Sequence, residues 1–240
     1  MFWSRIAGPA CGAVVCAVLL SGCQPATLAA PSAATTPTAV VSSSAASASS
    51  ATPSPTGGIY GDPAAAAKYW QQQSLEDNCG LVSVADVVGE VTGNEPTEKQ
   101  MIALAVKTPS GTNPGPIYAN DGTGGIEMAD EVVLLQHFGI KSAMYWTTTP
   151  DQTGLPALKR YLGDDRKIIA WVNSAVIWNT SDQRTEADHF LVVTGIDTDK
   201  EIVHLNDPGA EHADERVSIS TFMTAWKTGK ESIVVAAAAG

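Results

Sequence analysis

The composition of the chain changes abruptly near residue 57, and this boundary limits where a folded core can form. Of the 34 residues from 24 to 57, 29 are Ala, Ser, Thr or Pro, and none is charged. Such a segment has too few large apolar side chains to offset the entropy of ordering its backbone. We therefore expect residues 23–57 to be a disordered linker. One domain is expected at 58–240, a length that can build a substantial core.

The segment before the linker has the features of an export signal. Arg5 is followed by an apolar run from 6 to 20, which is shorter than an ordinary membrane span. Leu20-Ser-Gly-Cys23 then resembles a bacterial lipobox, in which the cysteine is lipidated and becomes the first mature residue. We expect residues 1–22 to be a cleaved lipoprotein signal peptide, with an ordinary signal peptide or an uncleaved anchor as the alternatives. The lipid on Cys23 would hold the exported protein on the outer face of the bacterial cytoplasmic membrane.

The region 58–240 is strongly acidic, which excludes several classes of partner. It holds all 25 acidic residues and 13 of the 14 basic ones, so its formal charge is −12. A surface of this sign repels nucleic acid and anionic lipid. We therefore expect no nucleic-acid partner, and contact with the membrane only through Cys23.

Export processing would leave Cys79 as the sole free thiol of the mature protein. Cys11 and Cys16 would leave with the signal peptide, and Cys23 would carry the lipid. Cysteines of exported proteins are usually paired, so an odd one indicates an intermolecular disulfide or a reactive thiol. A small buried apolar side chain is the third reading of a free cysteine.

The neighbours of Cys79 favour a reactive thiol. Apolar residues recur at helical spacing after it, and Gly93 can end that helix. Asp77 or Asn78 could cap the start, which would put Cys79 in the first turn, where the helix dipole stabilises a thiolate. Gly80 would let a substrate backbone approach closely. One of the glutamines at 71–73 could donate a hydrogen bond to an oxyanion, or all three could form a solvated polar run.

The periodicity predicts helices in the first half of the domain and strands in the second. Helices are expected at 63–70, 79–92, 97–106, 127–137, 155–162 and 221–227, and strands at 168–173, 190–195, 202–205 and 232–236. The helix near 97 begins with a capping box, Thr97-Glu-Lys-Gln100. A long loop covers 108–125 and could shape a cleft. This order predicts an α+β fold, with a helical part packed on a mainly antiparallel sheet.

The segment from His189 to Asp207 predicts a β-hairpin that brings an imidazole to a carboxylate. If the loop is Asp197-Thr-Asp199, His189 lies directly opposite Asp207, where cross-strand Cβ atoms are roughly 4.5–5.5 Å apart. A two-residue loop would set His189 opposite Pro208, with Asp207 on the diagonal. Asn206 is an alternative orienting residue, although its side chain would face the other way. A carboxylate so placed orients a histidine that acts as base toward a thiol.

The remaining histidines and tryptophans have less specific readings. No ligand spacing recurs around His204 and His212, and no second cysteine is present, so we expect no metal and no other cofactor. His137 lies in the last turn of a predicted helix, where it favours the dipole. The tryptophans at 146, 171 and 178 are expected in the core or in the wall of a cleft.

Three motifs taken together resemble a known family. They are Gln73 to Cys79-Gly80, His189-Phe-Leu-Val-Val-Thr-Gly, and Asn206-Asp207-Pro208, and the glycine-rich segment at 122–125 adds to them. The set is similar to the papain-like cysteine peptidase family thirty-nine, whose best-known members cleave double-glycine leaders from bacteriocin precursors. The chain is most similar to its stand-alone exported branch, which has no attached transporter. Leu81 is a departure, because the family often has proline there.

The resemblance implies a papain-like fold and assigns roles by position. Cys79 would be the nucleophile, His189 the base, Asp207 the residue that orients it, and Gln73 an oxyanion donor. Substrate would contact Gly80 and two glycines of the long loop, Gly124 and Gly125. We expect hydrolysis of a peptide or protein substrate through a thioester. A thiol amidase acting on cell-wall peptides and a binding lipoprotein without turnover are the alternatives.

Overall fold

The computed structural model describes residues 58–122 and 124–238. The predicted signal peptide (1–22) and the predicted linker with Cys23 (23–57) lie outside the described residues. Those assignments and the domain boundary therefore stay predictions. In the part of the chain that the structure describes, none of the helices has the length and hydropathy needed to cross a membrane.

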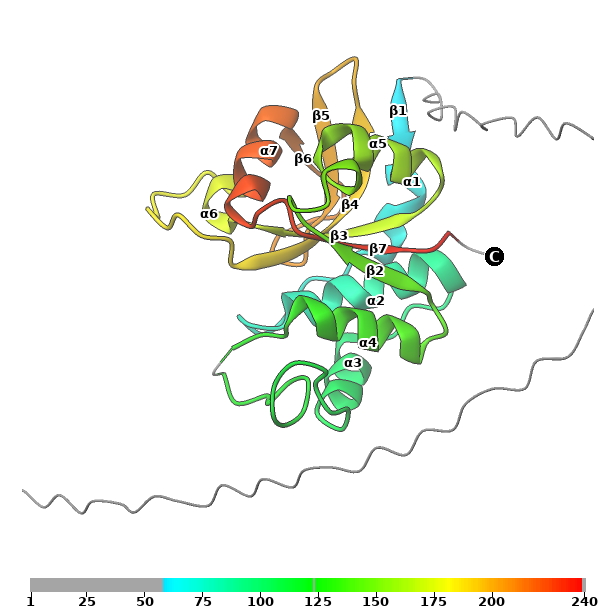
Figure 1. The fold of residues 1–240 in the computed structure, drawn as a ribbon, viewed down its shortest axis with the longest axis vertical. Coiled ribbons are helices and arrows are strands. Elements are labelled where there is room, and N and C mark those ends of the chain that lie inside the picture. Colours follow the sequence, from blue (N-terminus) through cyan, green and yellow to red (C-terminus); the bar gives the residue numbers. More distant parts are fainter. Residues whose placement is uncertain (1–57, 123, 239–240) are drawn as a thin grey trace, which may run out of the picture. The chain divides into compact units, whose positions relative to one another are not determined.

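The described residues contain seven strands, which form one sheet with antiparallel pairing throughout (Figure 1). Six strands follow the spatial order β2-β7-β3-β4-β5-β6, and β1 pairs with the last residues of β4. Their bounds are β1 Ile59–Gly61, β2 Ser142–Tyr145, β3 Lys167–Val172, β4 His189–Asp197, β5 Ile202–Asn206, β6 Glu215–Ser218 and β7 Ile233–Ala236.

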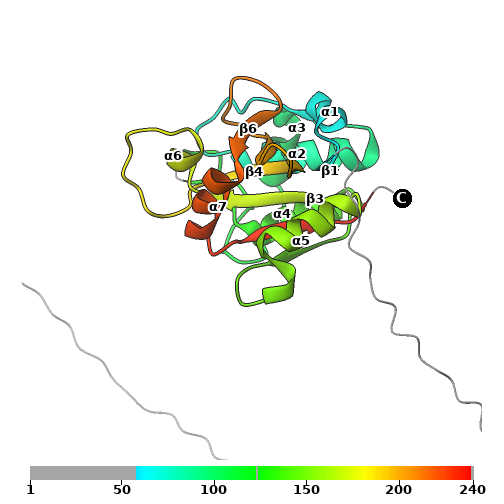
Figure 2. The ribbon, with the colours of Figure 1, turned by 90° about the horizontal axis from the view of Figure 1, so that it is seen from above.

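Helices pack on both faces of the sheet (Figures 1 and 2). On one face lie α2 (Cys79–Thr92), α3 (Glu98–Ala105) and α4 (Met128–His137), and on the other α5 (Gly154–Gly163) and α7 (Ile219–Thr228). Shorter turns are α1 (Pro63–Ala66), α6 (Ser174–Ile177), η1 (Ala67–Tyr69) and η2 (Pro150–Gln152). In both views the yellow segment between α6 and β4 projects beyond the sheet.

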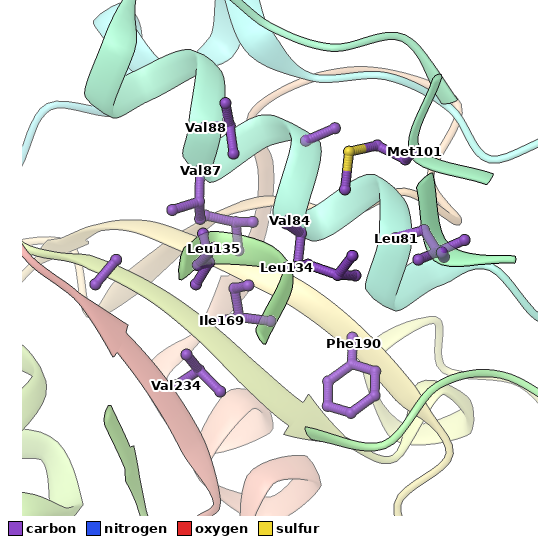
Figure 3. Close-up of a cluster of buried hydrophobic side chains, with 14 of the residues drawn as sticks. Leu81, Val84, Val87, Val88, Met101, Leu134, Leu135, Ile169, Phe190 and Val234 are labelled. Carbon is purple, nitrogen blue, oxygen red and sulfur yellow. The ribbon is translucent and has the colours of Figure 1, made fainter. Parts of the chain in front are cut away.

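Alternation along the central strands creates two apolar cores. Ile169, Phe190 and Val234 pack beneath α2 and α4 (Figure 3), whereas Ile168 and Leu191 face α5 and α7. Successive side chains of a strand point to opposite faces. A strand covered by helices on both faces therefore needs a continuous apolar run, as β3, β4 and β7 have.

The predicted α+β class and its mainly antiparallel sheet are confirmed. The helix after residue 79 ends where expected, with Gly93 in the left-handed conformation (φ 75°), and Thr97 and Gln100 form the predicted capping box. Five elements were not predicted: β1, β2, β6, α6 and η2. Each has only three or four residues, which is too short for a period to be recognised.

The register predicted for the β4–β5 hairpin is wrong. Val193 pairs with Leu205 rather than with Val203, and Asp197 pairs with Ile202 rather than lying in the loop. A bulge between Val193 and Gly195 then changes the register by one residue, which offsets only part of this shift. His189 is therefore not directly opposite Asp207.

The cause of the shift is the side chain of Asp197. Its Oδ1 accepts hydrogen bonds from the backbone N–H groups of Asp199 (3.1 Å) and Lys200 (2.9 Å), so the turn starts after Asp197. Glu201 adopts a left-handed conformation (φ 55°) that closes a four-residue loop. An aspartate that caps its own turn thus lengthened the loop beyond the predicted three residues.

Candidate active site

The first residue of α2 is Cys79, and the helix start lacks a side-chain cap. Asn78, one of the two residues predicted to cap this helix, occupies the N-cap position. Its side chain does not cap the helix, because its Nδ2 donates to Glu98 Oε1 (2.6 Å). Within the described residues, the first-turn N–H groups thus have no capping side chain. They retain partial positive charge at the position where an anion would bind.

The long loop before α4 supports the turn that leads into Cys79. Tyr118 donates its hydroxyl to Asp77 Oδ1 (2.6 Å), and burial together with Asp77 raises the pKa of that phenol. Gly125 passes so close to the backbone of Asp77 that a Cβ atom would lie 2.8 Å from the Asp77 carbonyl oxygen. The loop is in turn held by Asp130, which accepts hydrogen bonds from Ser110 Oγ (2.7 Å) and a backbone N–H (2.9 Å).

His189 and Asp207 meet at one end of the β4–β5 pair. The His189 Nε2 atom lies 2.6 Å from Asp207 Oδ1, and the two residues are only 4% and 0% exposed. His189 begins β4 and Asp207 directly follows β5, so both lie at the same end of this antiparallel pair and meet without direct opposition. Asn206 points to the other face, where its Nδ2 donates to Asp86 Oδ2 (2.7 Å).

The sulfur of Cys79 lies beside the start of β4. The backbone N–H of Phe190 donates to Cys79 Sγ at 3.5 Å. Since Asp207 binds Nε2 of His189, Nδ1 is the ring nitrogen left to exchange a proton with the thiol. Burial alone would lower the pKa of His189, but the hydrogen bonds with Asp207 and Cys79 outweigh it and raise the pKa to about 10. The imidazole is therefore cationic at neutral pH.

Asp207 is held as a carboxylate by three donors. Besides His189, it accepts hydrogen bonds from the Gly209 N–H (2.7 Å) and from Trp178 Nε1 (2.8 Å). Burial would raise the pKa of Asp207, but these bonds hold it below its usual value. Glu215 carries the opposite shift: burial and the negative charge of Asp207 raise its pKa to about 8.

A cavity of about 550 Å³ opens beside His189, and Gln73 is part of its lining. The Gln73 backbone N–H donates to the Pro208 carbonyl (2.9 Å), and Trp70 Nε1 donates to the Asp207 carbonyl (2.6 Å). These two bonds tie the segment before Cys79 to the end of β5. Gln73 Nε2 donates one hydrogen to the Leu75 carbonyl (2.7 Å), which leaves its second amide hydrogen for another acceptor.

The predicted glycines have structural reasons of their own, either close packing or backbone conformation. A Cβ on Gly80 would lie 2.7 Å from a side-chain carbon of Ile126 and 3.1 Å from the ring of Phe190, so glycine is needed there for close packing. Gly124 has a positive φ of 152°, a conformation that other residues rarely adopt. Substrate contact by Gly80, Gly124 and Gly125 stays a prediction.

Three residues that contact the His–Asp pair were not assigned to it from the sequence. Trp178 was expected only in the core or a cleft wall, and its ring lies edge-to-face with His189 at 5.1 Å between centroids. Gly209 and Glu215 were not singled out. Trp178 and Glu215 reach Asp207 only through the tertiary fold, and their local sequences carry no pattern that would identify them. Gly209 is two residues from Asp207, so the turn sequence Asp207-Pro-Gly209 was a local signal that could have identified this contact.

The other histidines lie apart from this site. His204 Nδ1 binds Asp214 Oδ1 (2.6 Å), whereas His137 and His212 are exposed. Across residues 58–122 and 124–238, no three His, Cys, Asp or Glu side chains gather closely enough to hold a metal ion.

A thiol at a helix start beside a buried His–carboxylate pair is the set of groups that papain-like peptidases use. The chain belongs to the Peptidase_C39 like family, whose model matches residues 9–233. This match confirms the family read from the sequence and assigns the chain to the C39-like peptidase class.

The chain is also similar to several proteins of known sequence and to several solved structures. The chain is 42% identical over 198 residues to Uncharacterized protein Rv1268c of Mycobacterium tuberculosis and to Uncharacterized protein Mb1299c of Mycobacterium bovis, covering 75% of this chain and 84% of each relative. It is similar to a structure described as a C39-like peptidase from Bacillus anthracis (TM-score 0.47, 19% identity, 69% of this chain and 92% of that one). It is also similar to the peptidase domain of Streptococcus ComA, a bi-functional ABC transporter (TM-score 0.44, 15% identity, 70% and 97%).

Proposed function

We propose that residues 58–240 are a cysteine peptidase domain that cleaves peptide bonds through Cys79, His189 and Asp207. The observation that carries the proposal is a continuous chain of contacts. Asp207 binds one nitrogen of His189 at 2.6 Å, and the sulfur of Cys79 lies 3.5 Å from the backbone nitrogen of the next residue, Phe190. The adjoining cavity is lined by His189 and gives substrate access to that residue.

The proposed reaction has two halves. The Cys79 thiolate attacks the carbonyl carbon of the scissile bond, the C–N bond breaks, and the His189 imidazolium protonates the leaving amine. A thioester remains on Cys79. Neutral His189 then takes a proton from water, the resulting hydroxide attacks the thioester, and a carboxylic acid and the thiolate are released. Asp207 keeps the ring oriented and stabilises its cationic form in both halves.

Two donors are available for the oxyanion in this mechanism. The Cys79 backbone N–H belongs to the uncapped first turn of α2, and Gln73 has one uncommitted amide hydrogen in the cavity lining. Loss of one such donor typically slows acyl transfer about 10²–10³-fold. Gln73→Ala therefore tests the second donor. Gln72→Ala is its matched control, because residue 72 is the same residue type one position away.

Reactivity of the thiol is the first test. The full chain is treated with a chloroacetamide probe, and the modified peptide is identified by mass spectrometry. We expect Cys79 to react much faster in the folded protein than in urea, and His189→Ala to remove that difference. A folded-state rate no higher than the urea rate would support the alternative of a binding lipoprotein without turnover.

Turnover separates the peptidase from the amidase. The wild type and Cys79→Ala are each incubated with unfolded proteins and with peptidoglycan fragments, and new N-termini are sequenced. We expect new N-termini in the unfolded proteins, made by the wild type alone. Release of stem peptides from peptidoglycan, with proteins left intact, would instead identify a cell-wall amidase.

We also propose that Cys23 carries the lipid that anchors the exported protein on the outer face of the cytoplasmic membrane. The motif Leu20-Ser-Gly-Cys23 after a short apolar run supports this location. Cells fed a clickable fatty acid should label the wild type and not Cys23→Ala. The variant should lose its membrane association, and a variant that stayed membrane-bound and labelled would contradict the anchor.

A further inference from the structure

Exposed apolar side chains gather at the cavity beside His189. Among the described residues, three large apolar side chains are exposed: Leu75 (37%), Trp146 (40%) and Trp178 (40%). Leu75 and Trp178 both line this one cavity, although they belong to segments far apart in the sequence. Apolar surface that stays open to solvent at a cavity is typical of ligand-binding sites.

Polar contacts hold both apolar walls in place. The Trp178 ring is fixed by its bond to Asp207 and by Gly209, where a Cβ would lie 2.4 Å from the ring. The carbonyl of Leu75 accepts a bond from the Gln73 side chain, and the preceding Ser74 binds Glu98 through its N–H (2.6 Å) and Oγ (2.7 Å). Binding of a ligand side chain therefore costs little entropy for ordering these two segments.

Each cationic side chain of the lining is already paired with a carboxylate, and His189 is paired with Asp207. Arg184 pairs with Asp182 and with Asp188, and Asp188 also accepts bonds from the Ser174 N–H and Oγ (both 2.9 Å). The guanidinium charge is thus balanced, while Glu76 adds a further negative charge to the lining. The cavity suits a neutral apolar side chain and disfavours a carboxylate.

The position of His189 decides which substrate residue enters. If the proposed function holds, His189 protonates the leaving amine, so the residue that carries this amine lies on the His189 side of the sulfur. His189 belongs to the cavity lining, and Cys79 does not. The cavity therefore lies on the amine side of the scissile bond.

We propose that this cavity is a specificity subsite for the residue directly after the scissile bond, and that it selects a bulky apolar side chain held between Leu75 and Trp178. The proposal rests on the peptidase function for its orientation. Leu75 is the specificity-determining residue that can be changed on its own, because Trp178 also positions Asp207.

The first experiment uses the full chain and a randomised peptide library, with sequencing of the new N-termini. Matched peptides that differ only after the cut then give kcat/KM. We expect Leu or Phe at that position to exceed Gly by about 10–100-fold. Leu75→Ala should lower this ratio about tenfold with little change for the Gly peptide, and the control Trp146→Ala should not move it. An unchanged ratio in Leu75→Ala, or a preference for Asp, would overturn the proposal.

The second experiment needs no turnover, so it separates the two proposals. Leucinamide and glycinamide are titrated into the Cys79→Ala variant of the full chain, and the indole N–H signal of Trp178 is followed by NMR. We expect leucinamide to shift this signal, glycinamide to shift it less, and Leu75→Ala to abolish the difference. Binding without any cleavage by the wild type would retain the cavity as a binding site for an apolar side chain and reject the peptidase. Equal effects of the two amides would reject the subsite.

Discussion

Two histidines of this protein bind a carboxylate at the same distance, yet their surroundings differ. His189 Nε2 lies 2.6 Å from Asp207, and His204 Nδ1 lies 2.6 Å from Asp214. The second nitrogen of His189 is available to a sulfur, and the residue lines a cavity. The second nitrogen of His204 is enclosed, without a hydrogen-bond partner among the described residues.

The two carboxylates differ as well. Asp207 is completely buried and bound by three donors, whereas the Asp214 side chain is 21% exposed and shares its charge with the exposed Arg216. A short His–carboxylate contact is therefore no evidence of catalysis by itself. The group that faces the other ring nitrogen and the access of substrate to it distinguish the proposed catalytic pair from a structural one.

The largest expected contrast is between the two histidines. His189→Ala should lower kcat/KM by at least about 10³-fold, because it removes the base and the proton donor together. His204→Ala should retain activity within a few-fold, because the ring does not reach the sulfur. Turnover of the same peptide by both variants, with circular dichroism to check folding, makes the comparison. Equal losses of kcat/KM in the two variants would contradict the distinction between a catalytic and a structural histidine.

The carboxylates should give the next largest contrast. Asp207→Ala frees the ring of His189 and strips Trp178 and Gly209 of their acceptor, so we expect a loss on the order of 10²–10⁴-fold in kcat. Asp207→Asn keeps an acceptor for the ring and should recover part of that loss. Asp214→Ala is the matched control and should leave kcat unchanged. A rate for Asp207→Ala close to that of the wild type would show that His189 needs no orienting partner.

Glu215 gives a pH test of the site. Its pKa in the folded protein is about 8, above the ordinary value of 4.5, so its contribution to stability is complete below about pH 4.5 and is lost as the pH rises through about 8. His189, raised from 6.5 to about 10, adds a loss at higher pH in both proteins. Glu215→Gln should therefore lose less free energy of unfolding than the wild type between about pH 5 and 8. Urea titrations at several pH values measure the free energy of unfolding of both proteins. If it changed equally with pH in both, the raised pKa of Glu215 would be contradicted.

The smallest expected effect concerns the structural pair. Asp214→Asn keeps the shape of the side chain but removes its charge, and the partly exposed site screens that charge. We expect the free energy of unfolding to fall by about 1 kcal/mol or less, without any change in kcat. Thermal unfolding and turnover of one preparation measure both quantities. A loss of kcat here would mean that the two pairs are coupled.

How much the sequence could predict depends on how local each signal is. The helix after Cys79, its end at Gly93 and the capping box at Thr97 are set by neighbours within one or two turns, and all three agree with the structure. The hairpin register failed because it depends on hydrogen bonds made by Asp197 and on a bulge in β4. Neither feature can be predicted from the spacing of apolar residues.

The sequence by itself determined the order of thiol, imidazole and carboxylate, the α+β pattern and the family. These follow from residue type and local periodicity, which act over a few positions of the chain. Only the tertiary structure decided that Trp178 and Glu215 contact Asp207, and that His204 does not face the sulfur. Those contacts join residues of different segments of the fold, and they exist only once the strands have assembled into the sheet.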